Sequence, residues 1–214
     1  MAAEYSRELS VKVFAGQANL IRRGYRQGGA AGFGLRRLLV DVNGEPKGEL
    51  DRGEQKSIAT DRVILVPGPA EEVAVVQEIY RLFTTEGKSE RDIVGMLNAR
   101  GVVTDLRRPW SRGTVHQVLI NEKYVGDNVW ARTSFKLKNR HVANAEGEWI
   151  RAEGVFAPLV DRASFTRARE IIDARSDRLS DTKMLELLAS ARYQLVIGGR
   201  GDQRFGVADR EAVH

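Results

Sequence analysis

The sequence has 214 residues and a hydrophobic content of 42%, which is enough to bury a core in one large domain or two small ones. It contains no cysteine, which excludes disulfides and thiolate zinc sites, and its three histidines are too widely spaced to pair as metal ligands. We therefore expect no metal and no cofactor. The sequence also lacks an apolar run of about 18 residues and a signal-peptide pattern, and so indicates a cytoplasmic protein without membrane segments.

The net charge of +5 is unevenly distributed along the chain. Residues 1–40 hold 7 basic against 2 acidic side chains, and residues 91–141 hold 10 against 4. Residues 41–90, between them, hold 6 basic against 11 acidic side chains, and residues 142–214 are nearly balanced, with 11 against 12. Two basic blocks separated by an acidic one favour a nucleic-acid partner, although a chance scatter of surface charge also produces such patterns.

Residues 3–23 repeat apolar side chains at helical spacing and predict a helix. No N-cap precedes the pattern, so we expect the tail of a longer helix. Arg22, Arg23 and Arg26 gather at its end, where they suit either the negative pole of the helix dipole or a phosphate backbone.

A glycine-rich segment then ends the helix and leads, as a flexible linker, into a strand with the sequence LRRLLVD. The segment does not match a phosphate-binding loop, and the chain's Gly87-Lys88-Ser89 has no glycine where such a loop begins. Asn43-Gly44 predicts a hairpin turn, and the apolar run at 63–66 is expected to form the central strand of the sheet.

Three helices are expected next. Residues 70–84 carry acidic side chains in the first turn and one apolar face. Ser89 predicts the cap of a second helix, with Asp92 at its third position, Gly101 at its end, and a buried stripe of Ile93, Met96 and Leu97.

Ser111 predicts the cap of the third helix, which Asn121 ends. The β pattern YVGDNVWARTSF follows, and this order is typical of a helix-turn-helix with a hairpin wing. We therefore predict an α+β fold with a winged-helix-like core and a β-hairpin. A short strand and a helix that begins after Asp161 come next, with a buried face of Phe165, Ala168, Ile171 and Ile172.

The order and spacing of these motifs resemble the recombinase domain of large serine recombinases, the serine-integrase branch of the resolvase/invertase superfamily. The resemblance covers roughly residues 3–178 and rests on the order of its motifs, since no single one is diagnostic. The matching stretches are EYSRELSVKVFAG (4–16), GGAAGFGLRR (28–37), GE (53–54), TDRVILVPGPAEEV (60–73), LNARGVVT (97–104), Trp110 and HQVLINEKYVGDNVW (116–130).

The resemblance implies that residues 1–27 are the end of a long helix that links to a catalytic domain and that residues 28–180 are the DNA-binding domain. Residues 181–214 lack a clean period and helix caps, and we expect them to form an irregular or disordered tail. It places the catalytic serine upstream of residue 1, and Ser6 and Ser10 do not match its motif, so we expect a truncated member without catalytic residues that is inactive alone in strand exchange. Without cysteines the chain cannot form the zinc ribbon that many members carry. The implied partner is double-stranded DNA, bound as a homodimer or tetramer through the first helix in DNA integration by a mobile genetic element.

If the third helix reads DNA, its core face leaves Gly113 and Gln117 pointing outward, with Thr114 and His116 beside them. Gln117 can pair with adenine, Thr114 can touch a thymine methyl or a phosphate, and Gly113 permits close approach. Nearby arginines are expected to bind phosphates, and the segment from 27 to 37 to follow the minor groove as an arm. The predicted DNA-binding residues are Arg26, Arg36, Arg37, Arg107, Arg108, Arg112, Gly113, Thr114, His116 and Gln117.

Other interpretations remain open. An exposed polar face explains Gln117 and His116 equally well, Trp110 is expected in the core, and the basic run at 132–141 fits a solvated loop as well as a DNA contact. The main alternative function is a stand-alone helix-turn-helix regulator. An enzyme built on Asp51, Glu54 and Asp61 and an assembly module built on the first helix are the others.

Overall fold

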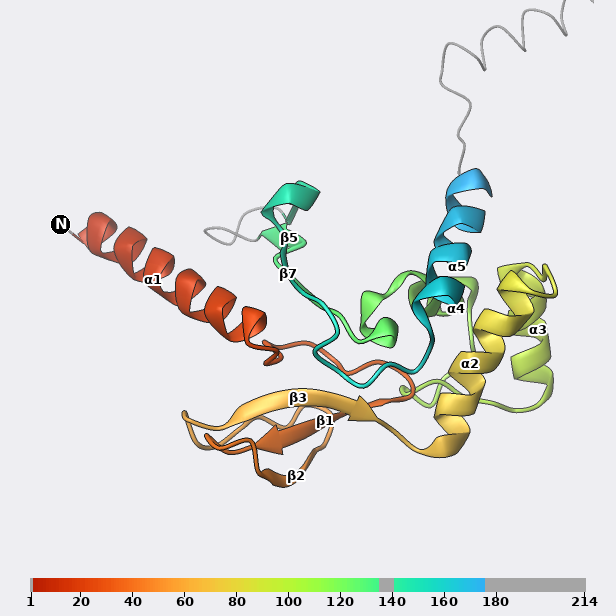
Figure 1. The fold of residues 1–214 in the computed structure, drawn as a ribbon, viewed down its shortest axis with the longest axis horizontal. Helices are drawn as coiled ribbons and strands as arrows, with labels where there is room; N and C mark the ends of the chain where they lie inside the picture. The colour runs from red at the N-terminus through yellow and green to blue at the C-terminus, as the bar shows by residue number, and fades with distance from the viewer. Residues whose placement is uncertain (1, 135–140, 176–214) are drawn as a thin grey trace, which may run out of the picture. The chain divides into compact units, whose positions relative to one another are not determined.

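The computed structural model describes residues 2–134 and 141–175, and it combines helices with small antiparallel sheets, as the α+β prediction required (Figure 1). The chain divides into two compact units, Met1–Ile172 and Asp173–His214, and the predicted tail at 181–214 lies outside the described residues. In chain order the elements are α1 (Ala2–Arg22), β1 (Leu35–Val40), β2 (Pro46–Leu50), β3 (Arg62–Pro67), α2 (Ala70–Thr84), α3 (Glu90–Ala99), α4 (Arg112–Ile120), η1 (Glu122–Val125), β4 (Asn128–Trp130), β5 (Thr133–Ser134), β6 (Val142–Ala143), η3 (Glu146–Glu148), β7 (Ile150–Ala152) and α5 (Arg162–Arg175).

The helix predicted over residues 3–23 is α1. Its C-terminal half packs against β4 and β7, where Ala18 and Ile21 are buried and the ring of Phe14 lies 5.1 Å from that of Trp130. The helix ends at Arg22, and the turn that follows it includes Gly24, whose φ of +86° few other residues adopt without strain.

The sheet of β1, β2 and β3 has the order β2-β1-β3, so the prediction that residues 63–66 form the central strand is wrong (Figure 1). The predicted turn at Asn43-Gly44 is present and pairs β1 directly with β2. Because this tight turn leaves no room for a strand between β1 and β2, β3 must lie at an edge of the sheet. It pairs with the other edge of β1, from Leu35–Pro67 to Val40–Arg62.

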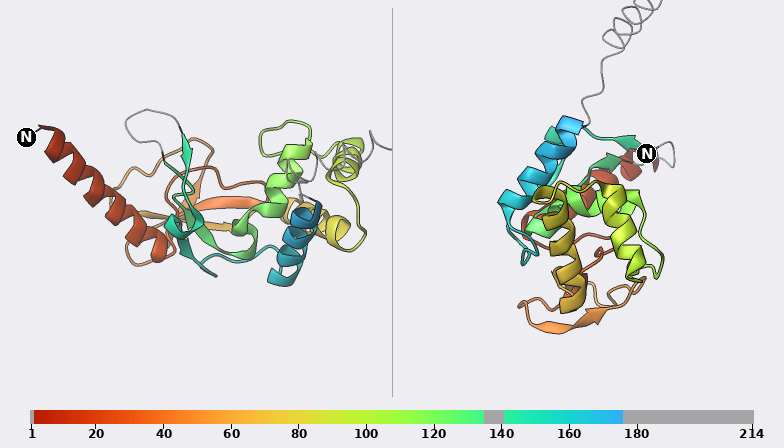
Figure 2. Two further views of the ribbon diagram at one scale, coloured as in Figure 1. Left: turned by 90° about the horizontal axis from the view of Figure 1, so that it is seen from above. Right: turned by 90° about the vertical axis from the view of Figure 1, so that its right-hand side faces the viewer.

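Helices α2, α3 and α4 contact one another around one apolar core (Figure 2). The capping box predicted at Ser89 and Asp92 is present, and Ile93 and Leu97 are fully buried. Met96, predicted in the same stripe, is 38% exposed, which corrects that prediction. The half-buried Val94 packs against the core instead. The buried face of the helix therefore comprises Glu90, Ile93, Val94 and Leu97, which recur at helical spacing, and it leaves Met96 outside.

Trp110 is 3% exposed and meets the ring of Phe33 edge-on at 4.9 Å, which confirms its place in the core. Phe33 belongs to the glycine-rich segment, so that segment contributes to the core as well as linking α1 to β1.

After η1 the chain forms a hairpin of two two-stranded sheets, in which β4 pairs with β7 and, between them in the chain, β5 pairs with β6. Residues 135–140 of the predicted basic run lie outside the described residues. Gly126 begins this hairpin, and a Cβ there would lie 2.5 Å from the Phe156 carbonyl oxygen, so the site requires glycine. Helix α5 begins after Asp161 as predicted, buries Phe165 and Ala168, and leaves Ile171 and Ile172 half-buried.

Candidate nucleic-acid interface

Helix α4 presents one face to the core and the opposite face to solvent. Ser111 caps it through a capping box, in which the Ser111 Oγ accepts from the Thr114 backbone N–H and the Thr114 Oγ1 accepts from the Ser111 N–H. Gly113 and Gln117 are exposed, as the helical spacing predicts. The half-buried Thr114 uses its hydroxyl in the cap. The opposite face buries Val115, Val118 and Leu119.

The loop before α4 exposes Arg107 and Arg108 on a braced backbone. The buried Thr104 donates from its N–H and its hydroxyl to the Arg108 carbonyl, at 2.9 and 3.0 Å, and accepts from the Arg107 N–H at 2.8 Å. The Asn98 side chain then ties the loop to α3 through both backbone groups of Trp110. Neither arginine side chain bonds to any other described residue. Both cations are therefore available to a ligand.

Glu90, at the start of α3, holds two of the predicted residues on α4. Its carboxylate accepts from the Arg112 Nε and contacts the His116 Nδ1, both at 2.6 Å. Glu90 is only 8% exposed, whereas the Arg112 side chain is 69% exposed. Burial alone raises the pKa of Glu90, but the hydrogen bonds and charges of Arg112 and His116 outweigh it, and the net shift is downward.

Sequence reasoning missed Glu90, because an acidic residue in the first turn of a helix is already explained by the helix dipole. Only the packing of α3 on α4 brings it to residues 22 and 26 positions further along the chain. Its carboxylate therefore orients the Arg112 and His116 side chains before any ligand binds.

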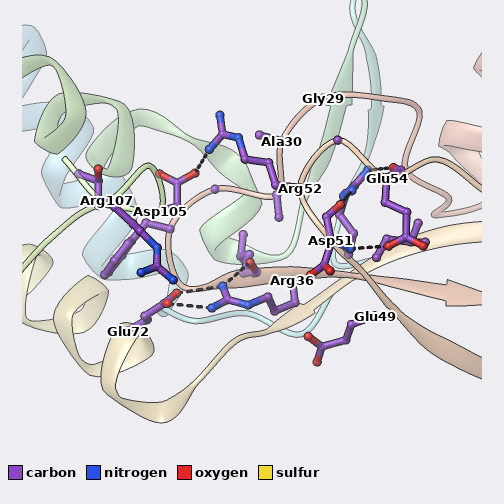
Figure 3. Close-up of a pocket in the computed structure, with 18 of the residues that line it drawn as sticks. Gly29, Ala30, Arg36, Glu49, Asp51, Arg52, Glu54, Glu72, Asp105 and Arg107 are labelled. Carbon is purple, nitrogen blue, oxygen red and sulfur yellow. Dashed lines mark hydrogen bonds and ion pairs between the residues drawn. The ribbon is translucent and has the colours of Figure 1, made fainter.

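Arg36 and Arg37 lie in a different place, along a groove of about 1060 Å³ between the glycine-rich segment, β1, residues 49–55 and the loop 102–107 (Figure 3). Arg36 makes a two-pronged ion pair with Glu72, at 2.7 and 2.9 Å, and Glu72 also accepts from the Gly34 N–H. This pair raises the pKa of Arg36 and lowers that of Glu72. Arg37 donates to the backbone carbonyls of Asp51 and Glu54.

The charge of this groove is acidic on balance. Arg52 pairs with Asp105 across it at 3.2 Å, and Arg107 reaches it from the loop (Figure 3). Six carboxylates line it beside four arginines: Glu49, Asp51, Glu54, Glu71, Glu72 and Asp105. The arginines predicted to form an arm for DNA are thus largely engaged by groups within the protein.

The predicted residues therefore fall into three groups. Arg112, Gly113, Thr114, His116 and Gln117 share α4, with Arg107 and Arg108 on the loop before it. Arg36 and Arg37 line the groove, and Arg26 lies in a small cavity beside Lys123. Over the described ranges, no cluster of histidine and acidic residues could hold a metal ion, and no helix is long and apolar enough to cross a membrane.

Comparison with known proteins gives a family for the central segment. Residues 70–175, from the start of α2 to the end of α5, match the Recombinase family model. No curated protein matches the chain.

Two solved structures resemble the chain at 17% identity. One comes from work on the sequence requirements of the Listeria innocua prophage attP site and covers 76% of this chain and 51% of its own, with a TM-score of 0.45. The other is the crystal structure of an LSR–DNA complex and covers 77% of this chain and 38% of its own, with a TM-score of 0.47. The chain thus spans about half or less of the length of these proteins. The family match identifies residues 70–175 as a member of the Recombinase family.

Proposed function

We propose that the chain binds double-stranded DNA sequence-specifically as part of a site-specific serine recombinase. In this proposal α3 and α4 act as a helix-turn-helix, with α4 in the major groove and the hairpin of β4 to β7 as a wing. The observation that carries the proposal is the solvent face of α4, where Gly113 and Gln117 are exposed on a helix fixed by its buried face. The exposed Arg107, Arg108 and Arg112 precede them in the chain. The Recombinase match over residues 70–175 contains this helix and supports the assignment.

The side chains of this surface would serve two roles, base contact and phosphate contact. Gln117 carries an amide that can pair with adenine N6 and N7, and Gly113 lets the backbone approach the base edges. Arg107, Arg108 and Arg112 supply positive charge for phosphates, which positions the helix without conveying sequence. His116, held by Glu90, contributes a ring nitrogen at the edge of the same surface.

We also propose that copies of the chain associate on DNA through α1. The N-terminal half of this helix exposes apolar side chains that the described residues do not cover, among them Tyr5 at 69% and Leu9 at 49% exposure. Exposed apolar side chains at helical spacing are typical of helices that pack against another helix.

The test is fluorescence anisotropy of the chain with labelled duplex DNA over a range of salt concentrations, followed by selection of a preferred site from a random library. We expect affinity to fall steeply with salt, by a slope of about 0.9 for each phosphate contacted. A chain that does not bind duplex DNA at low salt contradicts the proposal.

Gln117→Ala tests the base-reading role on the selected site. We expect the preference at one base pair to relax, at a cost of about 1–3 kcal/mol for that pair. Gln55→Ala, a change of the same kind at an exposed position remote from α4 in the sequence, is the control and should leave the preference intact. Equal weakening on every sequence would assign Gln117 a positioning role instead.

A further inference from the structure

A second basic site lies where the segment that follows α1, η1 and the start of the hairpin meet. A cavity of about 190 Å³ there is lined by Arg26, Lys123 and Arg132, together with Glu122 and Asp127. This volume suits a small anion, because pockets for drug-sized ligands measure about 300–1,000 Å³.

The two carboxylates of this cavity are mainly occupied by other arginines. Both oxygens of Asp127 bind the guanidinium of Arg162, at 2.7 and 3.0 Å. Glu122 binds Arg151 at 2.7 Å and reaches Arg132 only at 3.4 Å. The negative charge lining the cavity is therefore directed away from Arg26 and Lys123.

Within residues 2–134 and 141–175, Arg26 has no acceptor for its guanidinium. Its Nε is buried without a hydrogen-bond partner, and none of its side-chain nitrogens bonds to any residue that the structure describes. Burial and the nearby charge of Arg132 lower its pKa. A buried guanidinium without an acceptor costs free energy unless a ligand completes its hydrogen bonds.

Lys123 is similarly incomplete. Its ammonium donates to the carbonyl oxygens of Ala30 and Ala31, at 3.2 and 2.7 Å, which leaves one of its three N–H groups for another acceptor. Burial and the charges of Arg26 and Arg132 lower the pKa of Lys123 to about 8. A bound anion would offset these repulsions.

We propose that this cavity is a binding site for one phosphate group, held by the guanidinium of Arg26, the ammonium of Lys123 and the guanidinium of Arg132. A phosphate group offers several oxygens to donors that converge from three segments, which matches this arrangement better than a single acceptor does. The group can come from the DNA backbone, in which case the inference rests on the proposed function, or from free phosphate. On DNA, this site would contribute a phosphate contact in addition to those of α4, and such a contact positions the protein without reading sequence.

Titration of the full chain with inorganic phosphate tests the site directly. At constant ionic strength, maintained with sodium chloride, we expect saturable NMR shifts of the Arg26 Nε–H and of the Lys123 backbone amide. Arg26→Gln should weaken phosphate binding about tenfold, the usual effect of losing one charge-assisted hydrogen bond. Arg7→Gln on α1 removes the same charge at an exposed position outside the cavity and should change nothing.

Arg132→Gln provides a second variant in case Arg26→Gln does not fold. The Arg132 side chain is 37% exposed and its removal leaves the contacts of Lys123 with Ala30 and Ala31 in place. Absent shifts in the wild type, or identical titrations of wild type, Arg26→Gln and Arg132→Gln, would overturn the proposal.

A second measurement, the salt dependence of duplex DNA binding, identifies the source of the phosphate. If the backbone supplies it, Arg26→Gln should lower the salt slope of duplex binding by about one unit, while Arg7→Gln leaves the slope unchanged. Saturable phosphate binding with an unchanged slope supports the site with free phosphate as its ligand. Saturable phosphate binding by a wild type that does not bind DNA also supports the site, and in that case the proposed function alone fails.

Discussion

Two of the Arg-Arg dipeptides in the chain, Arg36-Arg37 and Arg107-Arg108, lie in different surroundings. Arg36 and Arg37 lie in β1, where Glu72 and the carbonyls of Asp51 and Glu54 accept their hydrogen bonds. Arg107 and Arg108 lie on the loop before α4, and their side chains make no bond to any described residue. Both pairs have the same charge in the sequence, but only the second offers that charge freely to a ligand.

The difference shows that the number of arginines in a basic cluster does not tell how much of their charge the fold leaves unpaired. Glu72 is 36 residues from Arg36 along the chain, so no local pattern announces their contact. In the folded protein, Arg36 and Arg37 are thus bound by groups of the protein itself, whereas Arg107 and Arg108 stay exposed to solvent or a ligand.

The largest expected effect concerns Trp110, whose contact with Phe33 joins the two regions. Trp110→Ala should lower the free energy of unfolding by about 3–5 kcal/mol, because it leaves a cavity in the core. Trp110→Phe should cost about 1.5 kcal/mol or less, since it keeps an aromatic ring and removes an indole N–H that has no partner among the described residues. Urea unfolding measures both values.

Leu106→Ala is the matched control for Trp110, since this side chain lies in the same loop and is 45% exposed. We expect it to change stability by no more than about 0.5 kcal/mol. Equal losses for the two alanine variants would show that the loop is not anchored through Trp110.

The second prediction breaks the internal pairing of Arg36. Glu72→Ala should destabilise the protein by about 1–2 kcal/mol, because it removes the acceptor for a partly buried guanidinium and for the Gly34 N–H. Glu71→Ala removes a charge from the same helical turn at an exposed position and controls for the helix dipole. If both variants unfold at the same urea concentration, the Arg36–Glu72 pair contributes nothing to the fold.

The third prediction sharpens the comparison on DNA. Arg107→Ala/Arg108→Ala should lower the salt slope of binding by roughly two units and the affinity on the order of tenfold. The sequence alone predicts a loss of roughly 1–2 units for Arg36→Ala/Arg37→Ala as well. With both side chains bound internally we expect a smaller change in slope, accompanied by lost stability. Equal slopes for the two double variants would mean that DNA competes successfully with Glu72 for Arg36.

The elements of the fold were largely predictable, and the pairing between them was not. Two helix caps and one turn could be predicted, at Ser89, Ser111 and Asn43-Gly44, because the interactions that form them act within a few residues. The order of the strands and the exposure of Met96 depend on how distant segments pack, and the predictions for both were wrong.

Within the candidate site the same limit applies. The outward direction of Gly113 and Gln117 follows from helical spacing. The engagement of Arg112 by Glu90, and of Arg36 by Glu72, depends on tertiary contacts that a single sequence does not display. Charges can be counted from sequence, whereas their partners require a fold.

The smallest expected effect compares Glu90, which binds Arg112, with Glu72, which binds Arg36. Arg112 is 69% exposed and Arg36 only 30%, so water already solvates much of the Arg112 charge, and Glu90→Gln should cost less than Glu72→Ala, on the order of 1 kcal/mol at neutral pH. Because the folded protein lowers the pKa of Glu90, the stabilisation is present above its unfolded pKa of about 4.3 and is lost as the pH falls through the lower, folded value. The difference in unfolding free energy between wild type and Glu90→Gln should therefore shrink between about pH 5 and pH 3. A difference that stays constant over this range would mean that Glu90 acts through its shape, and that its charge does not hold Arg112 in place.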